Sequence, residues 1–420
     1  MAVSHLPGVA VAIVDKGRIT KLAGYGDANL EWRAKVDPDT RFQLASGTKL
    51  FTAILLMRQV EKGALSLDDP LSKFFDGAPE SWRQIRVRQL ANHTSGLSED
   101  LGQPRPKTVA EALAASMKQP LAYTPGTEAR YGFTDFTILR AVLEKVGGAP
   151  LPALIDREIA KPLGLTATAF AMAEDDGSVR TGEVLSRRAS TYGWTGDRQR
   201  TSDFFFGPLG YGAGGLYSSA RDLAKLFAAI DQGKLLKSSS LQELITPATL
   251  PNGRKSGFGI GWTVRDYRGV PVVGHSGGPA LADILRIPST GRTIVVLTNQ
   301  HNFYPMLAER IADQGLPLPA LNPPADDRPA IAANLRALFA AVSSGGNDSP
   351  FIAPGSHPGE PLKSGFGKAA LEAVGPLSDI ALVRVERDGT RVYRLKFQRK
   401  IWDWSVKADA ADKIADMRPA

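Results

Sequence analysis

Hydrophobic and polar positions follow two different periods along this chain, and the period changes with position. Residues 9–14 form a continuous apolar run, and a turn over residues 15–17 leads into a second run, residues 19–23, the pattern of a β-hairpin. Over residues 46–65 the apolar side chains recur at helical spacing. Helical patterns separated by glycine- and proline-rich loops continue from about residue 68 to 230. The clearest helices are predicted over 108–118, 137–146 and 220–230, and strand patterns return over 257–264, 270–273, 284–287 and 293–297.

Strand-forming segments therefore lie at both ends of the first 300 residues, with helices between them. This order predicts an α/β (α+β) fold, in which a sheet built from both ends of the domain is flanked by helices and carries an inserted helical lobe of about residues 68–230. A proline-rich segment, residues 316–329, predicts a linker. Beyond it, a helical pattern and the strand patterns 381–385, 392–397 and 402–406 predict a small α+β domain. We expect domains at residues 1–315 and 330–420, joined by that linker.

Composition narrows the chemistry. The 420 residues contain no cysteine, which excludes disulfides, thiolate metal sites and a cysteine nucleophile. The five histidines are scattered and lie in no metal-binding motif, so we expect neither a metal nor another cofactor. The net charge of +8 would suit a protein that binds nucleic acid. However, the two most basic stretches, residues 83–88 and 394–400, alternate basic and apolar residues as half-buried strands do. We expect no nucleic-acid partner.

Two features bear on the compartment. No run approaches 18 apolar residues, so no transmembrane segment is expected. The first eight residues lack the basic and apolar regions of a signal peptide. The compartment stays open: cytoplasmic as the sequence stands, or periplasmic or secreted if a targeting segment has been removed.

Ser46 and Lys49 are the strongest candidates for catalysis. They form the single Ser-x-x-Lys sequence in the chain, at the start of the helix predicted after residue 46. A serine in the first helical turn has the positive end of the helix dipole beside it, which favours developing negative charge. A lysine three residues later lies on the same face and, when partly desolvated, can accept the proton of the hydroxyl. The alternative is a helix-capping serine with a surface lysine.

A longer series of motifs decides between these interpretations. The chain resembles the serine β-lactamase and penicillin-binding-protein superfamily, most closely the branch that holds class C-like enzymes, family VIII carboxylesterases and D-amino-acid peptidases. The resemblance covers about residues 7–299 and implies a two-lobed β-lactamase-like fold with its active site at the lobe interface. The motifs that carry it are, in order, Pro7-Gly8-Val9, Gly24-Tyr25-Gly26, residues 42–49, Leu65 to Pro70, Asn92 to Leu97, Pro125-Gly126-Thr127, Ala213 to Leu216, Ala220 to Leu223, Gly257 to Trp262 and Gly274 to Gly278.

The resemblance also implies roles for two residues of the helical lobe. Tyr131 stands where such enzymes carry a tyrosine that exchanges protons with the serine and the leaving group. Phe133 stands where they carry an asparagine that hydrogen-bonds a substrate amide. Since phenylalanine cannot make that bond, the sequence favours a substrate with a more apolar acyl group over β-lactams or peptides.

The third motif of the family is Lys-Thr-Gly, or often His-x-Gly in esterase and peptidase relatives; here it is His275-Ser276-Gly277. The resemblance places these three residues on a strand that lines the substrate cleft. The backbone N–H groups of Gly278 and Ser46 would then form the oxyanion hole. Because His275 replaces a permanent cation with a group that titrates near neutrality, recognition of a substrate carboxylate is less expected.

Ser276 is a competing nucleophile. The sequence Gly274-His275-Ser276-Gly277-Gly278 satisfies the G-x-S-x-G pattern of α/β-hydrolases. That pattern needs a helix directly after the serine, whereas a proline and another strand pattern follow here. We therefore expect Ser46 to be the nucleophile.

The sequence thus predicts a serine hydrolase that acts through an acyl-enzyme on Ser46, with Lys49 and Tyr131 moving the proton, and most simply a carboxylesterase on small esters. The alternatives are a D-amino-acid-type peptidase or amidase, a weak β-lactamase, or a penicillin-binding-like scaffold without catalysis. The expected partner is a small ester or amide substrate, and the exposed strands of the tail could serve homo-oligomerisation.

Overall fold

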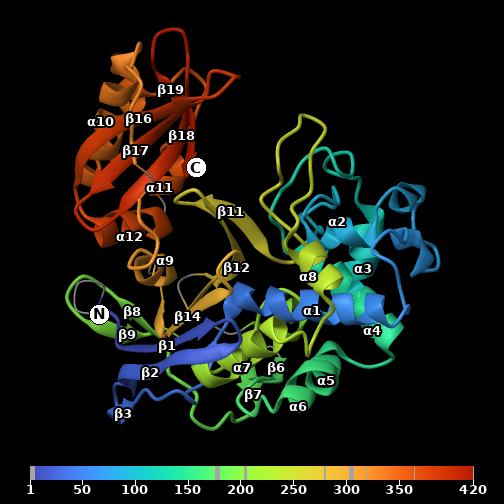
Figure 1. Ribbon diagram of the computed structural model, residues 1–420. Helices are drawn as coiled ribbons and strands as arrows, with labels where there is room; N and C mark the ends of the chain where they lie inside the picture. The colour runs from blue at the N-terminus through green and yellow to red at the C-terminus, as the bar shows by residue number, and fades with distance from the viewer. Residues whose placement is uncertain are drawn as a thin grey trace. The chain divides into compact units, whose positions relative to one another are not determined.

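The structure is a computed structural model that describes residues 5–175, 180–202, 206–278, 281–301, 307–318, 320–363 and 365–419. The chain divides into two compact units. The first contains residues 6–301 and Leu307–Ile311, and the second runs from residue 312 to the C-terminal end (Figure 1).

The first unit is built on a seven-stranded antiparallel sheet with the order β11-β12-β13-β14-β1-β2-β3. Strands β1 and β14 are neighbours, with Val9 opposite Thr298, so the sheet joins the two ends of the domain as the sequence predicts. Its strands are β1 (Gly8–Asp15), β2 (Arg18–Asn29), β3 (Ala34–Lys35), β11 (Thr263–Tyr267), β12 (Val270–Gly277), β13 (Ala282–Ile287) and β14 (Arg292–Thr298).

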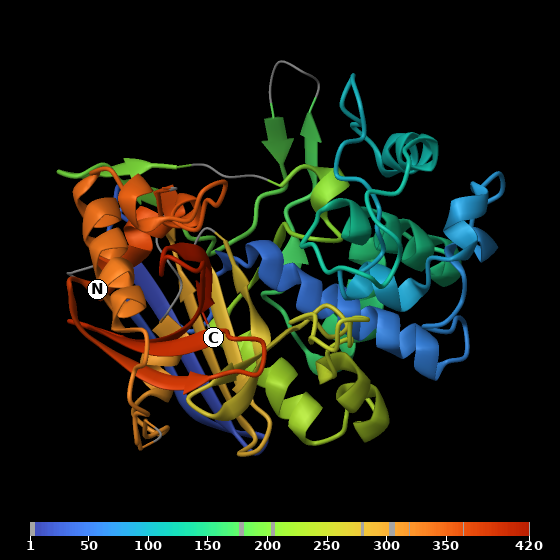
Figure 2. The ribbon, with the colours of Figure 1, turned by 90° about the horizontal axis from the view of Figure 1, so that it is seen from above.

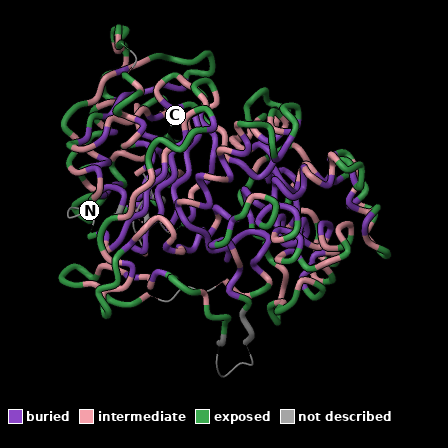
Figure 3. Tube along the Cα trace, turned by 60° about the horizontal axis from the view of Figure 1, so that its bottom comes forward, coloured by how far each residue is buried: buried purple, intermediate pink, exposed green. Residues whose placement is uncertain are grey.

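Helix α1 (Thr48–Glu61) lies between this sheet and the helical lobe (Figures 1 and 2). All its residues except Arg58, Val60 and Glu61 are buried. A helix that is buried almost all round belongs to the centre of a core. In Figure 3, buried residues form continuous stretches through the middle of the molecule, whereas many loop tips are exposed.

The remaining helices of the first unit form the lobe and cover the sheet. α7 (Ala220–Asp231) packs on β1, β2 and β14, and the Ser219 hydroxyl accepts the N–H of Asp222 at its first turn. The others are α2 (Val87–Ala91), α3 (Val109–Lys118), α4 (Thr134–Gly147), α5 (Leu151–Ile155), α6 (Lys161–Leu163), α8 (Ser238–Ile245) and α9 (Leu307–Ala312). No described helix has both the length and the apolar character needed to cross a bilayer.

Short strands and turns complete the unit. They are β4 (Phe42–Gln43), β5 (Ala169–Phe170), β6 (Ala173–Asp175), β7 (Arg180–Gly182), β8 (Tyr192–Trp194), β9 (Gln199–Thr201), β10 (Leu216–Ser218) and β15 (Gln300–His301). The prediction of a strand over 257–264 is wrong for its first part, because β11 begins at Thr263. Gly257 and Gly261 have φ values of 80° and 69°, and the N–H of Gly259 bonds to the carbonyl of Trp262, so this glycine-rich segment turns instead of extending.

The second unit contains a four-stranded antiparallel sheet and helix α10 (Pro329–Ser344). The ring of Phe339 on α10 lies 5.6 Å from that of Phe397 and 5.4 Å from that of Trp404, so the helix packs on one face of the sheet. The predicted helix and three strands form, while the last strand and the two helices before the sheet are not among the predicted elements. The other elements are β16 (Leu377–Val385), β17 (Arg391–Phe397), β18 (Ile401–Ala408), β19 (Ile414–Pro419), α11 (Glu360–Lys363) and α12 (Gly365–Val374).

Candidate active site

Ser46 stands on a sharp backbone turn between strand β4 and the buried helix α1. A 3₁₀ turn, Ala45–Gly47, leads directly into the helix. Ala45 has a φ of 45°, a left-handed conformation that a non-glycine residue keeps only where the surrounding structure holds it. The N–H of Leu44 donates to the carbonyl of Leu216 on β10 at 2.8 Å and anchors the turn. Ser46 is thereby half-buried at the N-terminal end of a helix, where the dipole favours negative charge.

Lys49 lies one turn further along α1 and provides the site with a buried amine. Its Nζ is 3.5 Å from Oγ of Ser46 and 2.8 Å from the hydroxyl oxygen of Tyr131, and it donates to the carbonyl of Ala213 at 3.1 Å. Only 2% of Lys49 is exposed. Burial lowers the pKa of Lys49 to about 7, against the opposing effect of the Glu99 and Asp135 carboxylates. Near pH 7 a part of the population therefore carries a neutral amine, which can accept a proton.

Tyr131 reaches the site from the segment that precedes α4. Its hydroxyl donates to Oγ of Ser46 at 2.9 Å, so it links the serine to Lys49. Although 49% of Tyr131 is exposed, the hydroxyl faces these two groups. Burial of the hydroxyl raises the pKa of Tyr131. The phenol therefore stays protonated near neutral pH and can pass a proton between the serine and the lysine.

His275 lies on β12, with its ring centroid 6.1 Å from that of Tyr131. It is 6% exposed, and its Nδ1 is 2.7 Å from the carbonyl oxygen of Ser276, to which it donates when Nδ1 carries the proton. Burial, with a contribution from the charge of Lys49, lowers the pKa of His275 to about 3. His275 is therefore a neutral polar group in this site and supplies no positive charge.

The structure separates the side chain of Ser276 from that of Ser46. Ser276 stands opposite Asp283 on β13, and its hydroxyl donates to the Asp283 carboxylate at 3.0 Å. Since side chains alternate along a strand, Ser276 points to the face of the sheet opposite to that of His275. Asp283 also accepts the N–H of Ala308 at 2.8 Å, and its burial raises the pKa of Asp283 to about 6. No described contact links the Ser276 hydroxyl to Ser46, Lys49 or Tyr131.

Gly277 and Gly278 bring β12 against the turn that carries Ser46. A methyl group at Gly277 would lie 2.0 Å from the carbonyl oxygen of Leu44, so only glycine allows this approach. Gly278 follows directly, is exposed, and has no atom within 4 Å of the place where a side chain would start. The backbone of the His-x-Gly motif therefore adjoins the turn that carries Ser46.

Comparison with known families agrees with this arrangement. The model of the Beta-lactamase family matches residues 1–336. This chain belongs to the β-lactamase family. It therefore has the β-lactamase-like fold and is a member of the superfamily of serine β-lactamases and penicillin-binding proteins, as the sequence predicts.

Three proteins are examples of what this β-lactamase-family chain is similar to in sequence or structure. Protein flp of Staphylococcus aureus is 29% identical over 178 residues, which are 40% of this chain and 35% of that protein, so the chain spans about a third of the length of this relative. A D-stereospecific amidohydrolase from Streptomyces sp. is 26% identical, with a TM-score of 0.56 over 70% of this chain and 90% of that one. An octameric penicillin-binding-protein homologue from Pyrococcus abyssi is 24% identical, with a TM-score of 0.63 over 98% of this chain and 88% of that one. The alignment with the last of these proteins covers residues of both units.

Sequence reasoning missed the residues that surround Tyr131 in this β-lactamase-family site. Nδ1 of His93 is 3.0 Å from the carboxylate of Asp135, which also accepts the hydroxyl of Ser95. The His93 ring packs 4.7 Å from that of Tyr131 and 5.0 Å from that of Phe258. His93 lies in the family motif Asn92 to Leu97, and this segment is the signal that could have placed it beside the tyrosine.

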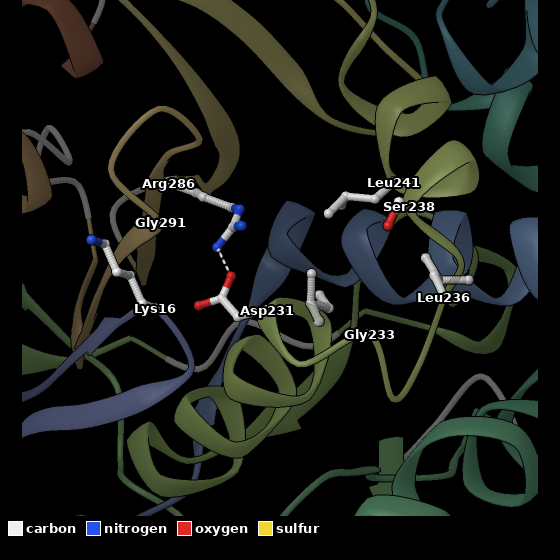
Figure 4. Close-up of a pocket in the computed structure, with 9 residues that line it drawn as sticks. Lys16, Asp231, Gly233, Leu236, Ser238, Leu241, Arg286 and Gly291 are labelled. Carbon is white, nitrogen blue, oxygen red and sulfur yellow. Dashed lines mark ion pairs between the residues drawn. The ribbon is translucent and has the colours of Figure 1, made fainter.

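A separate hollow of about 300 Å³ lies at the turns of the sheet and is lined by Lys16, Ile230, Asp231, Gly233, Leu236, Ser238, Leu241, Arg286 and Gly291 (Figure 4). Its buried charges are satisfied within the protein. Arg286 lies 2.5 Å from Asp231, which also accepts the N–H of Gly17 at 2.8 Å. This hollow contains none of the family's catalytic residues, and its ion pair ties the end of α7 to β13. No group of three metal-ligating side chains occurs in the part of the chain that the structure describes.

Proposed function

We propose that this protein is a serine hydrolase that forms an acyl-enzyme on Ser46 and acts as a carboxylesterase on small esters. The observation that carries the proposal is the hydrogen-bonded set of Ser46, Tyr131 and Lys49 around a lysine whose pKa burial lowers to about 7. A nucleophile whose proton acceptor lies within hydrogen-bond reach is the arrangement that covalent acyl transfer needs.

In the proposed reaction, the neutral amine of Lys49 takes the proton of Ser46, directly or through the hydroxyl of Tyr131. Oγ attacks the carbonyl carbon of the ester, and the N–H groups of Ser46 and Gly278 hold the oxyanion. Collapse of this intermediate expels the alcohol, which takes its proton from Tyr131 or Lys49. Water, activated by the same two residues, then attacks the acyl-enzyme, releases the acid and restores Ser46.

The charge of the site supports an ester over a substrate with a carboxylate beside the scissile bond. His275 is neutral at every pH near 7, because burial lowers its pKa to about 3. Lys49, the only lysine among the groups proposed for catalysis, is buried and hydrogen-bonded to its neighbours. A substrate carboxylate would therefore give up its hydrating water in this site and find no permanently charged partner in exchange. Burying such an unpaired charge is costly.

The aromatic side chains near Tyr131 support an apolar acyl group. Phe133, in place of the family's asparagine, is 40% exposed. A methyl group at Gly210 would lie 3.0 Å from Cζ of Phe133 and 3.1 Å from Cδ1 of Phe206, so both rings converge on this glycine. They offer hydrophobic area and no amide partner. We therefore expect butyrate esters to be better substrates than acetate esters, and Phe133→Ala to reduce this preference.

The second candidate is a D-amino-acid-type amidase or peptidase, which the relation to the Streptomyces amidohydrolase favours. The deciding experiment compares p-nitrophenyl acetate and butyrate with D-amino-acid amides and nitrocefin, using the wild type, Ser46→Ala and Ser276→Ala. We expect ester hydrolysis that is lost in Ser46→Ala and kept in Ser276→Ala. The reverse result would assign the reaction to Ser276. A wild type that hydrolyses none of these substrates and takes no fluorophosphonate label on Ser46 would instead support a scaffold without catalysis.

A further inference from the structure

Glu99 makes a contact with the catalytic segment that the proposed reaction does not use. Its carboxylate accepts two backbone hydrogen bonds, from the N–H of Phe133 to Oε2 and from the N–H of Thr134 to Oε1, each at 2.9 Å. Phe133 is the N-cap residue of α4, and its own side chain provides no capping bond. The first N–H groups of a helix have no partner within the helix. Glu99, more than 30 residues away in the sequence, supplies the cap that the local sequence lacks.

The two hydrogen bonds from Phe133 and Thr134 to Glu99, which we call the Glu99 clamp, lie directly beside Tyr131 in the chain. Only Gly132 separates Tyr131 from Phe133, and a methyl group at Gly132 would lie 2.3 Å from Oε1 of Glu99. The φ of Gly132 is not positive, and a side chain at this position would meet the end of the Glu99 side chain, which would have to move. The carboxylate therefore rests on the backbone of the segment that aims the Tyr131 hydroxyl at Ser46 and Lys49.

The same carboxylate acts on the charge of Lys49. Five other polar groups face or surround this amine: Ser46 before α1, Asp135 on α4, His93 in the preceding loop, His275 on β12, and Tyr131 itself. The sixth neighbour, Ala213, offers a carbonyl and no titratable group. Asp135 already shares its charge with His93 and Ser95. Of the two carboxylates that favour protonated Lys49, Glu99 has the larger effect on its pKa.

We propose that Glu99 is a positioning residue for the proposed reaction: its carboxylate clamps the first turn of α4, so that Tyr131 meets Ser46 and Lys49. The negative charge of Glu99 also favours protonated Lys49. The inference rests on the proposed function only in that Ser46 is the nucleophile. Glu99 acts through Tyr131 and Lys49 and does not itself touch the reacting atoms.

The test compares Glu99→Gln, which keeps the size and loses the charge, with Glu99→Ala, which loses the clamp. Glu128→Gln is the matched control, because Glu128 is an exposed carboxylate three residues before Tyr131 that pairs with Arg130. The readout is kcat/KM for p-nitrophenyl butyrate against pH. We expect Glu99→Gln to move the midpoint of the acidic limb to lower pH by roughly half a pH unit or more, because loss of a negative charge makes Lys49 easier to deprotonate. We expect Glu99→Ala to lose about 10- to 100-fold in rate through misplacement of Tyr131, and Glu128→Gln to match the wild type.

Wild-type rates and an unmoved midpoint in both Glu99 variants would overturn the inference. A lower melting temperature with an unmoved midpoint would reduce Glu99 to a helix cap and overturn it as well. Ser46→Ala, measured alongside, separates this failure from failure of the proposed function, since only the latter leaves Ser46→Ala active. If the wild type cleaves no ester, the same midpoint is read from stability: the free energy of unfolding rises with pH once folded Lys49 has lost its proton, and Glu99→Gln must start that rise at lower pH.

Discussion

The amine of Lys49 lies nearer to the hydroxyl oxygen of Tyr131, at 2.8 Å, than to Oγ of Ser46, at 3.5 Å. The tyrosine hydroxyl in turn donates to the serine at 2.9 Å. When the hydroxyl hydrogens turn, so that Ser46 donates to Tyr131 and Tyr131 to the neutral amine, the shortest hydrogen-bonded route for the serine proton to the lysine passes through Tyr131. Burial lowers the pKa of Lys49, so a neutral amine is available, and raises the pKa of Tyr131, so the phenol keeps a proton and the additional proton is expected on the lysine.

Tyr131→Phe removes this route and keeps the ring. We expect kcat for p-nitrophenyl butyrate to fall by about 100- to 10⁴-fold, the usual contribution of a positioned proton-transfer group. Tyr123→Phe is the control, since the Tyr123 hydroxyl donates to the backbone carbonyl of His93, at 3.3 Å, and takes no part in the relay. Equal rates in the wild type and Tyr131→Phe would contradict the relay.

The pH dependence should follow Lys49. The reaction needs its neutral amine, and burial lowers its pKa to about 7, so kcat/KM should rise about tenfold per pH unit below pH 7 and level off above it. His275 should contribute no limb above pH 5, because its pKa lies at about 3. The measurement is kcat/KM from about pH 5 to 9 at constant ionic strength, with spontaneous hydrolysis subtracted. A rate that is flat over this range would argue against lysine as the base.

Lys49→Met should abolish activity and stabilise the fold in acid. The pKa of Lys49 is about 7 when folded and near 10.5 when unfolded, so the unfolded chain binds more protons between these values and the stability of the wild type rises with pH across that window. Below pH 7 the full cost of burying a charged lysine remains. Each pH unit by which the folded and unfolded pKa values differ corresponds to about 1.4 kcal/mol, and after the loss of the amine's hydrogen bonds we expect a gain of roughly 2–4 kcal/mol at pH 6. Urea unfolding at pH 6 and pH 10 should show this gain shrinking at the higher pH; a gain that does not change with pH would contradict the assignment.

Gly277→Ala should damage both stability and rate. The added methyl group would lie 2.0 Å from the carbonyl oxygen of Leu44, so β12 and the turn that carries Ser46 must move apart. Overpacking of this kind costs about 1–3 kcal/mol, and a displacement of the proposed oxyanion donor should lower kcat about 10- to 100-fold. Gly207→Ala is the matched control, because nothing lies within 4 Å of its added methyl group and its φ is −66°. Thermal unfolding and kcat of the two variants decide the point.

The sequence predicted the sheet and the placement of Ser46 and Lys49 because these depend on local spacing. Positions i and i+3 share a helix face whatever the rest of the chain does. It missed the turn at Gly257 to Trp262, where alternating glycines and apolar residues imitate a strand while two positive φ values bend the backbone. It also predicted the strand at 270–273 too short, since β12 continues to Gly277, and only the family resemblance placed His275 to Gly277 on a strand.

The hydrogen-bond partners of the site residues could not be predicted from the sequence. Neither the bond from Lys49 to the carbonyl of Ala213 nor the clamp of Glu99 on α4 joins neighbours in the sequence. The left-handed conformation of Ala45 has no local signal either, since alanine rarely adopts it. Such features arise from tertiary packing, which a pattern of hydrophobic and polar positions does not specify.

The hydrogen bond from Lys49 to the carbonyl of Ala213 has a consequence for the protein during its synthesis. Ser46 and Lys49 leave the ribosome before Tyr131, which follows 82 residues after Lys49, and before the Ala213 carbonyl, which follows 164 residues after it. A nascent chain that stops before Ala213 thus holds the serine without the surroundings that bury the amine, and a free lysine near pH 7 is fully protonated. Newly made chains should therefore stay inert toward esters until the helical lobe has folded around α1. The rate at which a fluorophosphonate labels Ser46 should then report when this folding is complete.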